Sequence, residues 1–157
     1  MSGVINKGRK FYVCETPKPG IVDATEYAGL VWVEVGFVVT IGETGANANV
    51  VSQDYHGTTV TQKRSGIINA GDPTIECGYA PEDLGQIAMN AIANNGAYYA
   101  FKMEMNDNPT GTTNTIKYNR GLVNGPVHSN GAVEDWDNRV YTLGLVQEQI
   151  EIAPTTI

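Results

Sequence analysis

An alternating apolar segment runs directly into a long polar stretch, and this junction limits how the chain can fold. Residues 31–41 (VWVEVGFVVTI) alternate as in a strand that buries one face. Residues 42–66 are dominated by Gly, Asn, Thr, Ser and charge, and apolar order returns at Ile67. Compact domains seldom keep polar excursions beyond about 12–15 residues unless they are functional or disordered. We therefore interpret 42–66 as an arm on a β-rich body. The side chains predicted to face the core are those of Val31, Val33, Val35, Phe37, Val39 and Ile41.

The remaining sequence predicts a mainly β body formed by a single domain over residues 1–157. Hydrophobic residues make up 41% of the chain, charged residues 17%, and there are 18 glycines. This composition is too apolar for a disordered chain and too irregular for a helical bundle. A β-sandwich or barrel of about six to eight strands fits it best. Predicted strands cover 11–14, 57–63, 74–79, 98–105, 115–123 and 139–152, with turns at 124–126 and 130–131 and a bulge near 146–149.

One helix is predicted over about residues 81–95, flanking the sheet. Pro81 suits a first helical turn, Glu82 and Asp83 favour the positive end of the helix dipole, and Gly96 provides a stop. Its apolar stripe is expected to comprise Leu84, Ile87, Ala88, Ala91 and Ile92.

The two ends of the chain are expected to lie outside the core. Residues 1–30 read as an N-terminal arm, frayed or held by a neighbouring subunit, with a single helical turn near 24–30. Residues 151–157 read as a C-terminal tail.

Charge and composition argue against several classes of protein. The net charge of −7 disfavours nucleic-acid binding through phosphate contacts. No segment approaches the roughly 18 apolar residues of a membrane span, so no membrane insertion is expected, and the first residues lack the apolar region of a secretory signal. Cys14 and Cys77 are interpreted as buried thiols rather than a disulfide.

Catalytic and metal-binding patterns are missing from the sequence. His56 and His128 read as surface histidines. The acidic group Glu134, Asp135 and Asp137 reads as a solvated loop, because the EF-hand spacing is absent. Neither a nucleophile-elbow motif nor a phosphate-binding loop occurs. We therefore expect no enzyme, no cofactor and no metal, while the aromatic residues leave a carbohydrate- or ligand-binding β-sandwich open as an alternative.

Several segments together resemble the phage tail tube proteins of long-tailed phages. The resemblance covers most of residues 11–150 and rests on WVEVGFVVTIGETG, VSQD, TQKRSGIINAGDPTIECGYAPEDLGQ, YYAFKMEMND, IKYNRGLVNGP and VYTLGLV. It implies a β-sandwich or barrel with a flanking helix, whose copies form hexameric rings that stack into a hollow tube delivering double-stranded DNA. The inner tubes of contractile tails and secretion systems share this architecture and remain an alternative.

The resemblance also implies a location and a set of partners. The chain would be made in the host cytoplasm and reside in the virion tail. It would bind further copies of itself, the tape measure protein, the tail terminator and the distal tail or baseplate proteins. Double-stranded DNA would pass through the lumen without specific binding.

Carried onto this sequence, the resemblance makes 42–66 the assembly arm, ordered in the tube and mobile in the monomer. Its expected interface residues are Val50, Val51, Tyr55, Val60, Lys63 and Arg64. Six copies at −7 each give −42 per ring, and an acidic lumen would keep DNA from adhering to the wall. The candidate lumen-facing carboxylates are Glu34, Glu76 and Glu104.

Overall fold

The chain is mainly β, as predicted, but it has more strands than expected and two helices. The computed structural model describes residues 5–108 and 111–155, so parts of the predicted N-terminal arm (1–4), the loop after residue 105 (109–110) and the C-terminal tail (156–157) lie outside it. Its elements are β1 Lys10–Val13, α1 Ala24–Ala28, β2 Val33–Val35, β3 Val38–Ile41, β4 Asn47–Gln53, β5 Gln62–Asn69, β6 Thr74–Gly78, α2 Leu84–Ile92, β7 Tyr99–Glu104, β8 Ile116–His128, β9 Asn138–Leu145 and β10 Ile150–Ile152.

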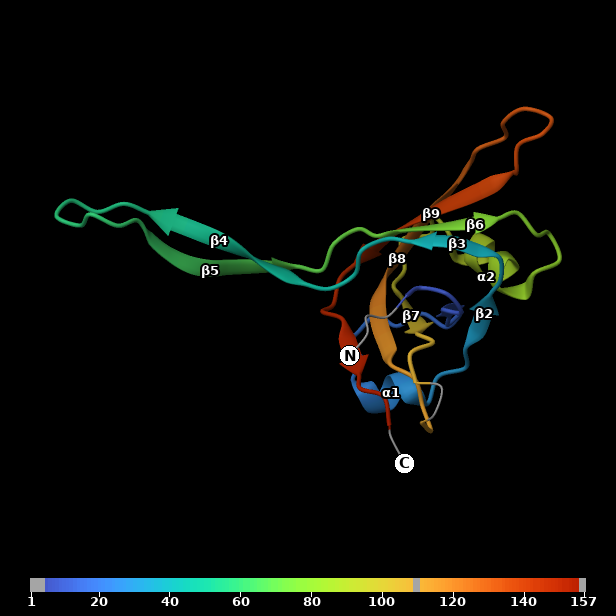
Figure 1. Ribbon diagram of the computed structural model, residues 1–157, viewed down its shortest axis with the longest axis horizontal. Helices are drawn as coiled ribbons and strands as arrows, with labels where there is room; N and C mark the ends of the chain where they lie inside the picture. Colours follow the sequence, from blue (N-terminus) through green and yellow to red (C-terminus); the bar gives the residue numbers. More distant parts are fainter. Residues whose placement is uncertain (1–4, 109–110, 156–157) are drawn as a thin grey trace.

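Eight of the ten strands form one antiparallel sheet in the order β2-β1-β7-β8-β9-β6-β3, with β10 paired to β8. The sheet curls strongly but does not close into a barrel (Figure 1). A cleft of about 330 Å³ remains between residues 6–9, just before β1, and the edge strand β3. Strands β4 and β5 form a separate two-stranded sheet that projects from the body.

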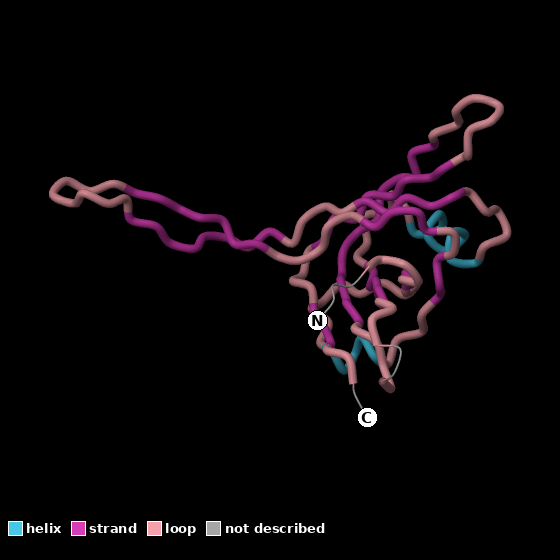
Figure 2. Tube along the Cα trace, in the orientation of Figure 1, coloured by secondary structure: helices cyan, strands magenta, loops and turns pink. Residues whose placement is uncertain are grey.

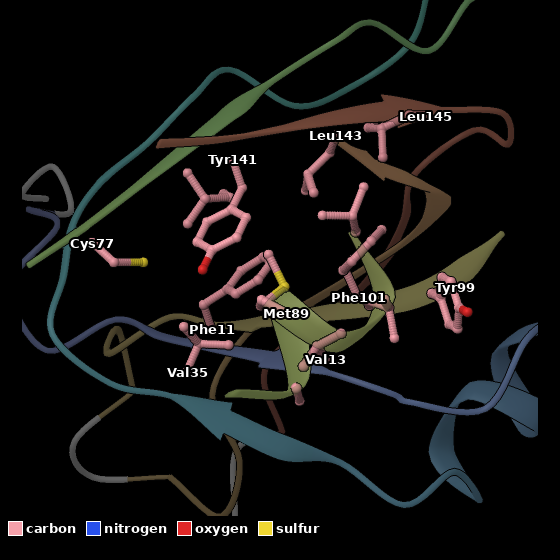
Figure 3. Packing of buried hydrophobic residues seen from close by; sticks show 14 residues of the cluster. Phe11, Val13, Val35, Cys77, Met89, Tyr99, Phe101, Tyr141, Leu143 and Leu145 are labelled. Carbon is pink, nitrogen blue, oxygen red and sulfur yellow. The ribbon is translucent and has the colours of Figure 1, made fainter. Parts of the chain in front are cut away.

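The main core lies between the curled sheet and α2 (Figure 3). Helix α2 approaches the sheet closely at Gly85, where a Cβ atom would overlap the carbonyl oxygen of Glu34 and the Cα of Val35. Asp83 caps the helix, because its carboxylate accepts from the backbone N–H groups of Gln86 and Gly36, both at 3.0 Å. The buried cluster comprises Phe11, Val13, Val35, Ile75, Cys77, Ala88, Met89, Ile92, Tyr99, Phe101, Val123, Tyr141, Leu143 and Leu145.

A second, smaller core anchors α1 to the opposite face of the sheet. The rings of Tyr27 and Tyr118 stack with their centroids 4.8 Å apart, and Tyr27 is fully buried. Gln147 binds both backbone groups of Val22, at 3.0 and 2.7 Å. The described part of the predicted N-terminal arm is thus held by its own chain.

The strand predicted over 31–41 is wrong as one continuous element. It is broken at Phe37, whose φ of +59° separates β2 from β3 and turns Val38 toward the core in place of Val39. A register shift between Val38 and Thr40 then returns Ile41 to the core side, as predicted. Phe37 and Val39 are consequently 70% and 63% exposed, and Val31, which precedes β2, is 82% exposed. The physical reason is topological, because β2 and β3 are the two opposite edges of the sheet and the chain must cross between them.

The buried face of α2 is also rotated from the predicted stripe. Leu84 and Ile87 are 72% and 50% exposed, and Ala91 is exposed as well. The core instead receives Gln86, which donates to the carbonyls of Gly36 and Gly78 at 3.1 and 2.8 Å. A pattern of apolar residues could not anticipate a glutamine that is buried because its hydrogen bonds are satisfied.

Two late predictions need correction. The predicted turn at 124–126 lies inside β8, where a bulge with Gly125 at φ +116° shifts the register to β9. The predicted strand over 139–152 is interrupted at 146–149, and β9 and β10 pair with successive parts of β8.

Cys14 and Cys77 are buried and free, as predicted. Burial, with smaller contributions from Asp83 and Glu76, raises the pKa of the Cys77 thiol to about 12. Of the helices in the described part of the chain, none has the length and apolarity needed to cross a membrane.

Candidate assembly interface

The polar stretch predicted as an arm forms a β-hairpin that extends away from the body (Figure 2). We call residues 47–69 the arm, since Asn47 and Asn69 are its first cross-strand partners. Its strands pair only with each other within residues 5–108 and 111–155. The end turn is closed by the N–H and hydroxyl of Thr58, which donate to the carbonyl of Tyr55 at 3.4 and 2.9 Å, and Gly57 supplies a φ of +87°.

The structure places all six predicted interface residues on this arm, with their side chains exposed. The exposed fractions are 69% for Val50, 56% for Val51, 55% for Tyr55 and 70% for Val60, and Lys63 and Arg64 are exposed too.

The cross-strand register separates these side chains into two faces. Val50 lies opposite Ser65 and shares its face with Lys63, while Val51 lies opposite Arg64 on the other face. Val51 is partly packed already, because it covers Gly66, where a Cβ would lie 2.8 Å from its Cγ2.

The arm carries two further apolar residues beyond the six predicted ones. Apolar order returns at Ile67 in the sequence, yet Ile67 and Ile68 lie in β5 and are 82% and 48% exposed. A two-stranded hairpin is marginal in water, and exposed aliphatic side chains along it indicate a surface for a partner.

The three predicted lumen carboxylates lie on one face of the large sheet, the face away from the main core. Glu34 is the cross-strand partner of Tyr12, and Glu104 is that of Lys10. Burial, followed by the charges of Glu104 and then Glu34, raises the pKa of Tyr12. This face is mixed in charge rather than purely acidic, because the Lys102 ammonium lies 4.7 Å from the centroid of the Tyr12 ring.

Glu76 lies in another part of the same face. It sits on β6, next to the buried residues Ile75 and Cys77, and accepts from the Asn138 side chain at 3.0 Å. The sheet order separates it from Glu34 and Glu104 by several strands. The structure therefore brings Glu34 and Glu104 together around Tyr12 and leaves Glu76 apart.

The acidic β8–β9 loop uses two of its three carboxylates locally. Asp137 pairs with Arg139 at 3.1 Å, and Asp135 accepts from the N–H of Ala132 at 2.8 Å. Within the described residues, no group of three or more His, Cys, Asp or Glu side chains has the geometry of a metal site. His128 is exposed and lies 3.2 Å from an Arg139 guanidinium nitrogen. His56 is exposed in the end turn of the arm.

A second exposed apolar surface lies at the start of α2. A cleft of about 390 Å³ is lined by Phe37 and by residues 80–83, and the exposed side chains of Leu84 and Ile87 follow on the helix. We call Phe37, Pro81, Leu84 and Ile87 the α2 patch. The exposed carboxylate of Glu82 borders it. Leu84 and Ile87 belong to the apolar stripe that the sequence predicts for the buried face of the helix, so the pattern locates them but predicts burial in their own core.

The fold is shared with chains from contractile injection systems. One neighbour is a chain of an extracellular contractile injection system (PVC), in its sheath/tube terminator in the extended state, with a TM-score of 0.69, 10% identity and coverage of 98% of this chain and 99% of the other. Another, from the PVC sheath-tube complex in the extended state, has a TM-score of 0.66, 11% identity and coverage of 96% and 92%.

A third neighbour belongs to the six-fold symmetrised baseplate of the anti-feeding prophage. It has a TM-score of 0.61, 9% identity and coverage of 92% of this chain and 91% of the other. No protein-family model and no curated protein matches the sequence. At these identities the similarity establishes the fold, which this chain has in common with chains of an extracellular contractile injection system and of the anti-feeding prophage baseplate.

Proposed function

We propose that this chain is a structural protein of a phage-tail-like particle, whose copies form hexameric rings that stack into a hollow tube. The arm carries the proposal, because a two-stranded hairpin with Val50 and Val60 about 70% exposed lacks a covering element among the described residues. The shared fold supports it, since one neighbour lies in a six-fold symmetrised baseplate and another in a sheath-tube complex. The inner tube of a contractile particle is favoured over a non-contractile tail tube, because two neighbours belong to a contractile injection system.

In this proposal the arm is the main contact between copies. Head-to-tail contacts close into rings in one direction and stack in the other. The arm loses backbone entropy when it docks, so it is ordered in the tube and mobile in the monomer. Ends of the tube bind the tape measure, terminator and baseplate proteins of the particle.

The face with Glu34, Glu76 and Glu104 is proposed to line the lumen. Six copies at −7 each give a ring of −42, which would keep a double-stranded DNA cargo from adhering to the wall. Lys10 and Lys102 on this face limit its local negative potential. The Glu76→Lys change in assembled particles should slow DNA ejection more at low salt than at high salt. Unchanged ejection would remove Glu76 from the lumen.

Negative-stain microscopy of the purified chain tests the assembly directly. Hollow tubes or stacked rings are the expected result. Single rings that never stack would instead favour a ring at the end of a tube, and a persistent monomer would favour the ligand-binding sandwich.

A matched deletion tests the role of the arm. Residues 48–68 are replaced by two glycines, which can join Asn47 to Asn69 because these two residues are cross-strand partners. The shortened chain should keep the circular dichroism and melting transition of the body but form no tubes. Normal tubes from this variant would contradict the proposed role.

A further inference from the structure

We propose that the arm of one copy docks on the α2 patch of the next copy, with Val50 entering the cleft beside Phe37 and Lys63 facing Glu82. This inference rests on the proposed function and names the surface that receives the arm. The α2 patch is one exposed apolar surface of the chain, and the arm carries a second one. Exposed apolar surfaces of this kind mark interaction sites, and a second copy supplies a partner for both at once.

The positions of the two surfaces suit a head-to-tail contact. The arm leaves the body on one side, and α2 lies on the opposite side (Figure 1). A contact between opposite sides of the same chain repeats from copy to copy, whereas a contact between identical surfaces would stop at a dimer.

The more available face of the arm is the one with Val50 and Lys63. Val50 is 69% exposed, while Val51 on the other face already covers Gly66. Val50 and Lys63 are diagonal neighbours across the strands, because Val50 pairs with Ser65 and Ser52 pairs with Lys63. A single surface therefore offers one aliphatic side chain and one cation.

The α2 patch offers the matching chemistry. The cleft beside Phe37 is open and lined mainly by apolar atoms, and Leu84 and Ile87 extend its apolar surface along the helix. Glu82 is exposed at its border and has no hydrogen-bond or ion-pair partner among the described residues. Asp83 is already engaged in capping α2, so Glu82 is the carboxylate left for Lys63.

Phe37 gives the patch an unusual feature that favours a role in binding. An aromatic residue at φ +59° is strained, and glycine would adopt this conformation more easily. The strained residue is nonetheless 70% exposed, so burial in its own core does not account for it. Strained positions of this kind cluster at binding sites.

Two substitutions separate assembly from stability. Phe37→Gly relieves the positive φ, and Leu84→Glu places a carboxylate in the first turn of α2, where the helix dipole favours it. The doubly substituted chain should melt at the same or a higher temperature as a monomer. Its critical concentration for assembly should rise about tenfold or more.

A matched control removes an aliphatic side chain elsewhere. Val133→Glu changes a fully exposed valine in the β8–β9 loop and should leave the critical concentration unchanged. Normal assembly of the Phe37→Gly/Leu84→Glu chain would overturn the proposal, as would an equal loss from Val133→Glu.

Cross-linking between two singly substituted chains tests the contact itself. A Val50→Cys chain mixed with a Leu84→Cys chain should form heterodimers with a short bis-maleimide, and the native Cys14 and Cys77 are too buried to compete. A Val51→Cys chain, whose substitution lies on the other face of the arm, should give at least about tenfold less cross-linked heterodimer with the Leu84→Cys chain. Preferential cross-linking of Val50→Cys to Val133→Cys would overturn the proposal.

A charge exchange provides an independent check. Lys63→Glu should weaken assembly, and adding Glu82→Lys in the same chain should restore it. Arg64→Glu is the control, because adding Glu82→Lys to it should not improve assembly. Rings that form without the Val50–Leu84 cross-link would overturn the docking of the arm on the α2 patch but would still support the proposed tube. The cross-link without rings would overturn the tube but support the docking.

Discussion

The arm and the body are both built from antiparallel strand pairs, but they differ in how far their apolar side chains are buried. Every strand of the body lies in one sheet that curls around a core capped by α2, with Phe101 and Tyr141 each 1% exposed. The arm has two strands, and its valines are more than half exposed. Hydrogen-bonded pairing alone thus does not stabilise an element, and the difference lies in the apolar area removed from water.

Hydrogen exchange should show the largest difference between the two regions. Amides in the centre of β7 and β8 open only with global unfolding, typically about 5–15 kcal/mol, whereas those of β4 and β5 in the monomer should open at close to zero. Mass spectrometry of exchanged monomer and of assembled tubes measures both. Arm amides as protected in the monomer as those of β7 would break the comparison.

Truncation of one side chain in each region gives the next largest contrast. Phe101→Ala should cost about 3–5 kcal/mol of unfolding free energy, since it opens a cavity beside Phe11. Val51→Ala on the arm should stay within about 0.5 kcal/mol. Urea denaturation of both monomers measures the two changes, and similar losses would show that the arm folds as part of the core.

A substitution of glycine tests how closely α2 must approach the sheet. Gly85→Ala improves helix propensity but should destabilise the body by about 1–3 kcal/mol, because the added Cβ overlaps the backbone of Glu34 and Val35. Gly20→Ala is the matched control, since it meets no atom within 4 Å. A stabilised Gly85→Ala chain would show that α2 can shift outward without loss.

Where one local rule decides the structure, the sequence predicts it correctly. The alternation of Tyr99, Phe101 and Met103 and the residues that start α2 correctly predicted a buried strand and a helix. The position of the interface candidates on an extended arm was likewise predictable, because the polar stretch was too long for a connection.

Errors arose where tertiary context overrides the local pattern. The side-chain phase at the start of β3 depends on Phe37, where the chain crosses between the sheet edges. The orientation of α2 depends on the satisfied hydrogen bonds of Gln86. The α2 patch could not be predicted for the same two reasons, because Phe37, Leu84 and Ile87 lie at positions where the pattern predicts burial in the core. Apolar patterning locates the side chains that need burial, but it does not say whether their own chain or another copy buries them.

Acid should act on a loop of the body and leave the end turn of the arm unchanged, and this effect is the smallest of the four. Asp107 accepts from the hydroxyl and N–H of Thr115 at 2.5 and 3.0 Å, and these hydrogen bonds lower the pKa of its carboxyl below the ordinary 3.8. The stabilisation is therefore complete above about pH 3.8 and is lost as the pH falls through the lowered folded-state pKa. The end turn of the arm instead uses the hydroxyl of Thr58 and the carbonyl of Tyr55, which do not titrate.

The Asp107→Asn chain keeps the shape of the loop without the charge. The difference in unfolding free energy between wild type and Asp107→Asn should stay constant from neutral pH to about pH 5 and then shrink below the ordinary pKa, while the amide shifts of 55–58 stay fixed. Parallel pH profiles for the two chains would show that this carboxylate does not hold the loop.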